Sequence, residues 1–200
     1  MVAAAFATCE NQYIAQHDAG IQLRDKLLQC FGMHPSFYTF AKTQEGKPYA
    51  VDAPFHFSIS HSGTLCCCAI SANLPFSKQV QEISLNMELS PCTPGPASWS
   101  WTDGILLLPE ISGNIGVDIE RVDFDANLDR LSKITKRYLH EADPPSNAAD
   151  FYQSWTRREA LGKFTGEGFF TKVPSHDVCL LSFQLKLQEQ IYFLSMAYSP

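Results

Sequence analysis

The chain has 200 residues, of which 45% are hydrophobic, and a formal net charge of −6 at pH 7. This length suits one compact domain or two small lobes that share a core. The acidic balance argues against a protein that binds nucleic acid by neutralising many phosphates. The sequence contains no apolar stretch of about eighteen residues, so we expect no transmembrane helix and no membrane partner.

The seven cysteines do not form a recognisable framework. Cys66–Cys68 are adjacent, so neighbouring thiols on a strand would point to opposite faces, and no cysteine or histidine spacing is typical of zinc. The N-terminus, MVAAAFATCENQY, lacks the basic residues of a secretory signal. These features favour reduced, buried cysteines in a cytoplasmic protein.

The first part of the chain indicates a helix followed by strands. Leu23, Leu27 and Leu28 recur at helical spacing, which predicts a helix from about Ile14 to Gly32. The stretches HFSISHSG and TLCCCAIS predict two strands that are joined at Gly63. The extended run SFYTFAKT and the turn EGKPY precede them.

The segment 73–113 is unusual because it combines strand-like stretches with a proline-rich loop. EISLNMEL alternates strictly, SPCTPGPASWSW is rich in proline, and GILLLPEI could be a returning strand. The segment is too short for a core of its own. We therefore interpret it as a β-hairpin-like excursion of an N-terminal lobe at 1–113, with a second lobe at 114–200.

The second part predicts a strand, two helices and a hairpin. NIGVDIE indicates a central strand, and a helix follows around Leu128 to Tyr138. Ser146 can cap a long helix that reaches about Phe164. The C-terminal VCLLSFQLKLQEQIYFLSMAYS predicts two antiparallel strands that turn near Gln188.

Two carboxylates in NIGVDIE need partners. Residues of a strand alternate between faces, so an apolar face can pack on helices while Gly116, Asp118 and Glu120 share the other face. The two acids would lie about 7 Å apart, where like charges raise each other's pKa unless a cation intervenes. Mg²⁺ with oxygen ligands fits this pattern, and the glycine leaves room for a ligand to approach. Alternating acids on a solvated edge strand are the plainer interpretation.

The helix FYQSWTRREALGKFTGEGF offers a third acid. Trp155, Glu159 and Lys163 are spaced by four residues and form one stripe. A surface Glu–Lys pair would explain the two charges, but the large aromatic residue suggests that the stripe faces protein. A metal ion for the glutamate and a phosphate for the lysine would then supply partners.

Four motifs taken together resemble the 4′-phosphopantetheinyl transferase superfamily. GKPY, FSISHSG, GVDIE and WTRREALGKFTGEGF occur in the family's order between Gly46 and Phe169. Because GVDIE lies in the middle of the chain, the resemblance is to the larger, surfactin-synthetase-activating type. That likeness implies an α/β (α+β) fold in which two related lobes, each a small and mostly antiparallel sheet packed with helices, form a pseudo-dimer within a monomer.

The resemblance also implies a reaction. These enzymes move 4′-phosphopantetheine from coenzyme A to a serine of an acyl or peptidyl carrier protein and release adenosine 3′,5′-bisphosphate. By motif, Asp118, Glu120 and Glu159 would hold Mg²⁺, and Glu159 would also be the general base. Lys163 would contact the pyrophosphate and offset charge on the leaving group.

Further positions match residues of the family that bind coenzyme A. Lys47, Ser60 and His61 match contacts to the nucleotide phosphates, although a core histidine would equally explain His61. Arg158 holds a usually basic position. Arg24 matches an arginine on the first helix, but a solvated helix face explains it nearly as well.

The chain departs from the family at its N-terminus. Relatives have some thirty further residues there that form a first strand and basic contacts, whereas here we expect the chain to begin almost at the first helix. Ile14 and Ala15 stand where relatives often carry an arginine, and His17 is an alternative. This departure leaves open a non-catalytic relative that only binds coenzyme A or a carrier protein. A metal nuclease is disfavoured by the net charge and by FSISHSG.

Overall fold

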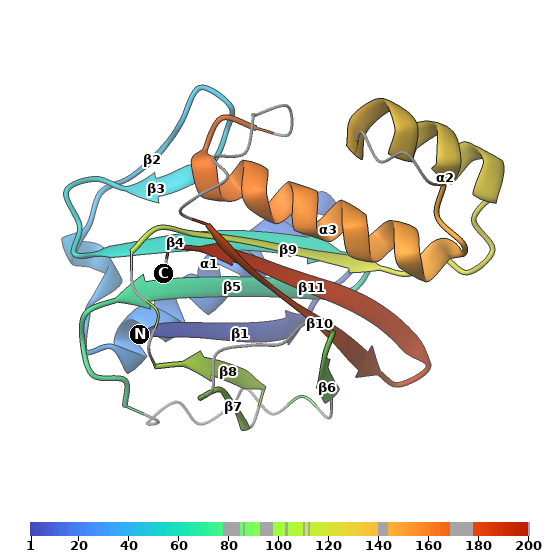
Figure 1. Ribbon diagram of the computed structural model, residues 1–200. Helices are drawn as coiled ribbons and strands as arrows, with labels where there is room; N and C mark the ends of the chain where they lie inside the picture. Colours follow the sequence, from blue (N-terminus) through green and yellow to red (C-terminus); the bar gives the residue numbers. More distant parts are fainter. Residues whose placement is uncertain are drawn as a thin grey trace.

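The computed structural model describes residues 1–77, 85, 87–92, 98–102, 104–109, 111, 113–139, 144–168 and 178–199. Part of EISLNMEL, including Ile83, and residues 93–97 of the proline-rich loop lie outside the described residues. The strands within the described residues form three antiparallel sheets, and helices pack against the two larger ones (Figure 1). This confirms the expected α+β class.

The larger sheet has five strands in the order β4-β5-β1-β8-β7. The predicted strands around Gly63 are confirmed as β4 and β5, and Gly63 turns between them with a φ of +57°. A separate two-stranded sheet pairs β2 with β3 over the GKPY turn. The strands are β1 (Val2–Thr8), β2 (Phe40–Lys42), β3 (Pro48–Ala50), β4 (Phe55–Ser62), β5 (Leu65–Ala72), β7 (Ser100–Thr102) and β8 (Ile105–Leu108).

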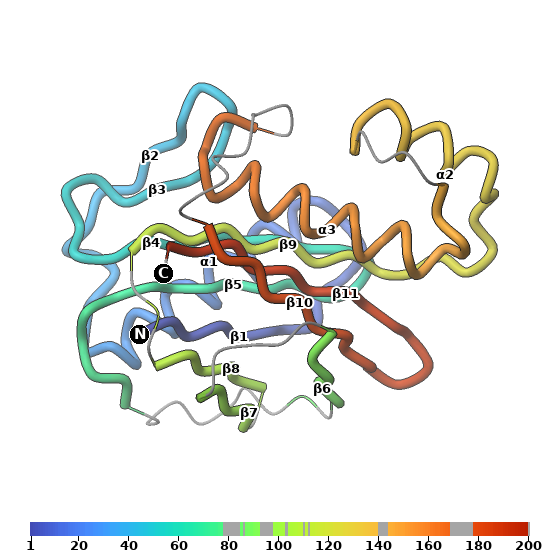
Figure 2. Tube along the Cα trace, in the orientation of Figure 1, coloured from blue at the N-terminus to red at the C-terminus, as the bar shows by residue number. Residues whose placement is uncertain are grey.

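The strand β1 corrects the expectation that the chain begins almost at its first helix. Val2–Thr8 lies between β5 and β8 in the middle of the five-stranded sheet, as the chain trace in Figure 2 shows. The stretch escaped sequence reasoning because a strand that is buried on both faces shows no alternation of apolar and polar residues.

The smaller of the two main sheets has four strands in the order β6-β10-β11-β9. The C-terminal hairpin and its turn at Gln188, which has a φ of +55°, are confirmed. Within the excursion, β7 and β8 form a short antiparallel hairpin. The stretches EISLNMEL and GILLLPEI do not pair with each other, because β6 pairs with β10 whereas β8 pairs with β1 in the other sheet. The strands are β6 (Met87–Pro91), β9 (Ile115–Arg121), β10 (Cys179–Leu187) and β11 (Gln190–Tyr198).

The helices lie close to the predicted positions. Asn147, not Ser146, caps the long helix α3, because its side chain accepts a hydrogen bond from the amide of Asp150. Gly32, with a φ of +73°, follows α1 as expected. None of the helices in the described residues is long and apolar enough to cross a membrane. The elements are α1 (Tyr13–Cys30), a 3₁₀ helix η1 (Pro35–Phe37), α2 (Leu128–Ile134), its π-helical continuation η2 (Thr135–Leu139) and α3 (Ala148–Thr165).

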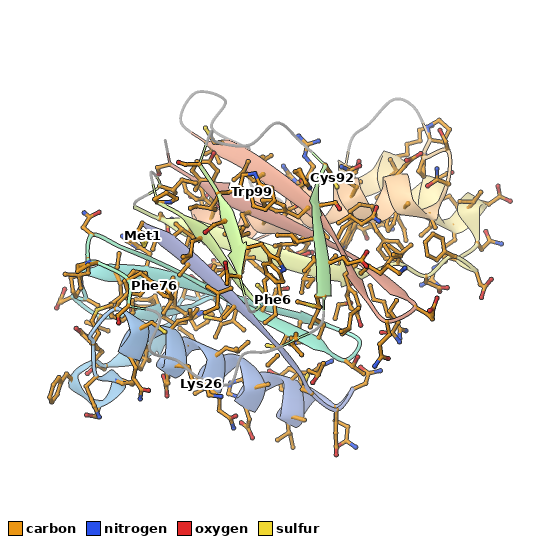
Figure 3. The ribbon with its side chains drawn as sticks, turned by 90° about the horizontal axis from the view of Figure 1, so that it is seen from below. Met1, Phe6, Lys26, Phe76, Cys92 and Trp99 are labelled. Atoms are coloured by element: carbon orange, nitrogen blue, oxygen red, sulfur yellow. The ribbon has the colours of Figure 1, made fainter. Side chains whose placement is uncertain are left out.

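The main core lies between the two large sheets. Phe6 of β1 contacts Trp101 edge to face at 5.6 Å, and Trp99 contacts Phe183 of β10 at 5.7 Å. Figure 3 labels Phe6 and Trp99 in this layer. The apolar face of β9 also points into this core and packs on the facing sheet, so our expectation that it would pack on helices is wrong. The helix α3 covers the opposite face of β9.

The two large sheets meet along their edge strands β4 and β9. Serine hydroxyls of β4 accept hydrogen bonds from backbone amides of β9 there, for example Ser58 from Val117 at 3.0 Å. This seam places the FSISHSG and GVDIE motifs side by side. The division into lobes at residue 113 stays a prediction.

Candidate functional site

A cavity of about 450 Å³ lies where β4, β9 and α3 meet. It is lined by residues from all four motifs that pointed to a function. They include Gly46 and Lys47 before β3, Ser60 and His61 of β4, Asp118 and Glu120 of β9, and Glu159 and Lys163 of α3. The strand and the helix that supplied the predicted acids therefore face one space.

Asp118 is the most buried acid of this site, with only 3% of its surface exposed. Its Oδ1 accepts a hydrogen bond from Ser60 Oγ at 2.8 Å and contacts the Lys163 ammonium at 2.7 Å. Its Oδ2 is also buried and has no hydrogen-bond partner among the described residues. A buried carboxylate oxygen without a partner costs free energy, and binding of a cation to this atom would recover that cost.

Glu120 lies two residues further along the same face of β9. Ser62 Oγ donates to Glu120 Oε2 at 2.7 Å. Burial, and after it the charge of Asp118, raises the pKa of Glu120 to about 7. Without a bound cation, the loss of contact with water and the nearby charge of Asp118 therefore disfavour the ionised form of Glu120.

Glu159 and Lys163 reach the cavity from α3. Burial, followed by the charge of Asp118, raises the pKa of Glu159, and Lys163 partly opposes that rise. Lys163 Nζ also donates to Ser60 Oγ at 2.9 Å. The predicted stripe does face protein, because Trp155 packs against a buried cluster that includes Val122 and Phe193 of the neighbouring segments, and Glu159 and Lys163 line the cavity.

The described residues contain no group of three ligand side chains that is already close enough to hold a metal ion. The residues present nevertheless fit a hard divalent cation. All three acids offer oxygen donors, which Mg²⁺ prefers, and Asp118 Oδ2 is buried without a partner. A dication would also offset the crowding of charge that raises the pKa values of Glu120 and Glu159.

Gly116 serves the helix and not a ligand. A Cβ at this position would lie 2.1 Å from the carbonyl oxygen of Ala160 and 2.3 Å from the amide of Phe164. The absence of a side chain therefore lets α3 lie directly on β9. Our expectation that this glycine leaves room for a ligand is wrong, but the close approach brings Glu159 and Lys163 to Asp118.

Lys47 contacts the end of this helix. Its ammonium lies 3.4 Å from the carbonyl oxygen of Phe164, which also accepts a hydrogen bond from the Asn114 amide. Cations near the C-terminus of a helix are favoured by its dipole. Burial lowers the pKa of Lys47 to about 8. Gly166 then ends α3 with a φ of +76°.

A second cavity of about 560 Å³ adjoins the first, and the two share Gly46, Pro48, Ile59 and His61. His61 is half-buried and lines both cavities, so it is not a core residue. Burial, and then the charge of Lys163, lowers its pKa.

Arg24 lines the second cavity and is not on a solvated helix face. Its side chain is largely buried, lies 3.6 Å above the ring of Phe40 and forms an ion pair of 2.7 Å with Asp25. His17 lines the same cavity. Arg158 lies on α3 beside Glu159, but it is not among the described residues that line either cavity.

Sequence reasoning missed Ser62 and Asn114. Ser62 holds Glu120, and Asn114 binds the end of α3. The repeat of serines at every second position of FSISHS is a signal that could have indicated a row of hydroxyls on one side of the strand. Nothing local in the sequence marks Asn114.

Comparison with known proteins supports the motif assignment. Residues 114–197, which include β9 and α3, match the model of the 4′-phosphopantetheinyl transferase superfamily. The chain is 26% identical over 161 residues to the 4′-phosphopantetheinyl transferase gsp of Aneurinibacillus migulanus. That alignment covers 76% of this chain and 48% of the relative, so the chain spans about half the length of the relative that it matches.

Proposed function

We propose that this chain, which belongs to the 4′-phosphopantetheinyl transferase superfamily, transfers 4′-phosphopantetheine from coenzyme A to a serine of an acyl or peptidyl carrier protein. One observation carries the proposal. Acids of β9 and α3 line a single cavity, in which a buried oxygen of Asp118 has no partner among the described residues.

The first cavity would hold the pyrophosphate of coenzyme A, and the second would hold its nucleotide. Asp118, Glu120 and Glu159 would hold Mg²⁺, which supplies positive charge to the pyrophosphate when bound. The adjoining cavity, which Arg24 and His61 line, is large enough for the nucleotide part of coenzyme A. Arg24, His61 and Lys47 offer cationic or hydrogen-bonding groups for its phosphates.

In the transfer, one phosphorus–oxygen bond forms and another breaks. The carrier serine Oγ attacks the β-phosphorus, and the bond from that phosphorus to the bridging oxygen breaks, so adenosine 3′,5′-bisphosphate leaves. Lys163 offsets charge on the pyrophosphate. Glu159 accepts the proton of the serine hydroxyl, directly or through water. Its raised pKa suits this role, because a general base works best when its pKa is near the operating pH.

A mass-spectrometric assay tests the proposal. The protein is incubated with coenzyme A, Mg²⁺ and a panel of apo carrier proteins, and the carriers should gain the mass of one phosphopantetheine group. Glu159→Gln should lower the rate about 10²–10⁴-fold without unfolding the protein, because it removes both a base and a charged ligand. Glu88→Gln is the matched control, since Glu88 is exposed on β6 at the other edge of the same sheet.

Two outcomes would contradict the proposal. Transfer that survives Glu159→Gln would remove this residue from the mechanism. Absence of modification on every carrier, together with calorimetric binding of coenzyme A, would favour the alternative of a non-catalytic relative. The observation that motivated that alternative is weakened, since the residues before α1 form the central strand β1.

A further inference from the structure

A row of three serines joins the two large sheets. Ser58, Ser60 and Ser62 alternate along β4, and each hydroxyl oxygen accepts a hydrogen bond from a backbone amide of the edge strand β9. The amides are spaced by two residues in the same way, so the row fixes the register of β9 against β4. The bonds run from Val117 to Ser58 at 3.0 Å, from Ile119 to Ser60 at 3.2 Å and from Arg121 to Ser62 at 3.0 Å.

Two of these hydroxyls also donate to the acids of the site. Ser60 Oγ donates to Asp118 at 2.8 Å, and Ser62 Oγ donates to Glu120 at 2.7 Å. In each case the carboxylate belongs to the residue that precedes the one whose amide donates to the serine. Ser58 has no carboxylate at the corresponding place, because the residue before Val117 is Gly116. Ser58 is therefore a control within the row, because it bonds to β9 but not to a carboxylate.

The two acids differ in how firmly they are held. Asp118 is short, almost fully buried, and also bound by Lys163. Glu120 has a longer side chain with one more rotatable bond and is only half-buried. Its contact with Ser62 is therefore the bond that restricts where its carboxylate points. A group that is held in place before a ligand arrives loses less freedom on binding.

We propose that Ser62 is a positioning residue, which accepts the amide of Arg121, donates to the Glu120 carboxylate and so presets that carboxylate for a divalent cation in the cavity. The inference rests on the proposed function for the identity of the site. Partners that orient a ligand side chain commonly change metal affinity about 10–100-fold when they are removed. Ser62 should act through Glu120 and not touch the substrate.

Calorimetry with Mn²⁺ as the probe tests this role on the full chain. Ser62→Ala should weaken Mn²⁺ binding about tenfold or more. Ser62→Thr, which keeps the hydroxyl, should bind within about threefold of the unmodified protein, since the donor to Glu120 is retained. Ser58→Ala removes an equivalent bond of the seam but no bond to a carboxylate, so its Mn²⁺ affinity should stay unchanged.

Thermal unfolding of the same variants separates positioning from folding. Ser58 is more buried than Ser62, so Ser58→Ala should lower the melting temperature at least as much as Ser62→Ala. The inference is overturned if Ser62→Ala binds Mn²⁺ like the unmodified protein, if Ser58→Ala loses as much affinity, or if threonine fails to rescue. It is also overturned if the unmodified protein binds no Mn²⁺.

The transfer assay distinguishes this inference from the proposed function. If the Mn²⁺ affinities divide as expected but no carrier is modified, the positioning role stands and the proposed function fails. If carriers are modified while Ser62→Ala keeps full Mn²⁺ affinity, the proposed function stands and the positioning role is wrong.

Discussion

The two long helices have the same length of 18 residues but meet their sheets in different ways. The helix α1 buries Leu23, Leu27 and Leu28 against the five-stranded sheet, in a core of large apolar side chains. The helix α3 contacts β9 through Ala160 and Gly116, so their backbones nearly touch. The first helix completes a core of large side chains along its length. The second packs large side chains near its start, at Phe151, but small ones at Ala160, where it brings charged side chains to a site.

Electrostatic interactions follow the same division. Lys163 of α3 forms an ion pair with the buried Asp118, and burial followed by the charge of Asp118 raises the pKa of Glu159. The ion pair of Arg24 on α1 stays within its own helix, with the neighbouring Asp25. The comparison teaches that α3 packs closely through small residues at the same place where it carries charged side chains into the protein. Three predictions test it, from the largest expected effect to the smallest.

Forcing α3 away from β9 should have the largest effect. In Gly116→Ala the new Cβ would meet backbone atoms of Ala160 and Phe164 at 2.1–2.8 Å, and backbone cannot move aside cheaply. We expect a loss of about 3 kcal/mol or more in the free energy of unfolding, measured by urea denaturation, together with loss of transfer activity.

Gly20→Ala on α1 is the matched control. Its Cβ would meet Cγ2 of Ile59 at 2.6 Å, a side-chain atom that can move only if the stiff χ1 of Ile59 changes. Replacing glycine by alanine inside a helix gains about 1 kcal/mol, which offsets part of the crowding, so the loss should be smaller than in Gly116→Ala, where backbone is in the way. Equal losses in the two variants would contradict the difference between the helices.

The buried charge at the site should make stability depend on pH. The pKa of Glu120 is about 7 in the folded protein and 4.5 as its ordinary value, so the folded state keeps a proton that the unfolded state releases between these pH values. Stability in a chelating buffer should therefore fall as the pH rises from about 4.5 to 7, by roughly 2 kcal/mol. Denaturant unfolding at several pH values measures this fall.

Two changes refine this test. Glu120→Gln cannot ionise, so much of the fall in stability should vanish in this variant. Addition of Mg²⁺ at pH 8 should stabilise the unmodified protein more than the variant, because a bound ion stabilises the folded state by mass action. A fall of the same size in Glu120→Gln as in the unmodified protein would contradict the raised pKa of Glu120.

The smallest effect concerns the first turns of the helices. The side chain of Asn147 caps α3, whereas Gln12 at the start of α1 makes no such hydrogen bond. Asn147→Ala should cost about 1 kcal/mol. Gln12→Asp should stabilise the protein by about 0.5 kcal/mol, since Gln12 already has the extended backbone of a capping residue and an acid suits a helix N-terminus. Opposite shifts in melting temperature would be measured by calorimetry.

The residues of the site could be predicted largely from the sequence because their chemistry follows local patterns. Alternation along NIGVDIE placed Asp118 and Glu120 on one face, and the spacing of four residues placed Glu159 and Lys163 on one stripe. Both patterns reach the same cavity. The roles of Arg158, Lys47 and the three acids in binding stay predictions.

The larger failures involve contacts between distant segments. The strand β1 was missed, and β6 and β8 were expected to pair although they join different sheets. The displacement of the α3 cap by one residue is a local error. Strand partners depend on which surfaces are left to be buried after the rest of the chain has packed. A single sequence does not show that choice.

The sequence by itself determined which side chains share a face, because the periods of strand and helix are properties of the backbone. Only the tertiary structure decided what those faces meet: that α3 lies on Gly116, that β4 supplies hydroxyls to the acids of β9, and that Lys163 lies against Asp118. Each of these contacts joins residues some forty or more positions apart. Their geometry comes from the packing of whole sheets and helices, which no local pattern specifies.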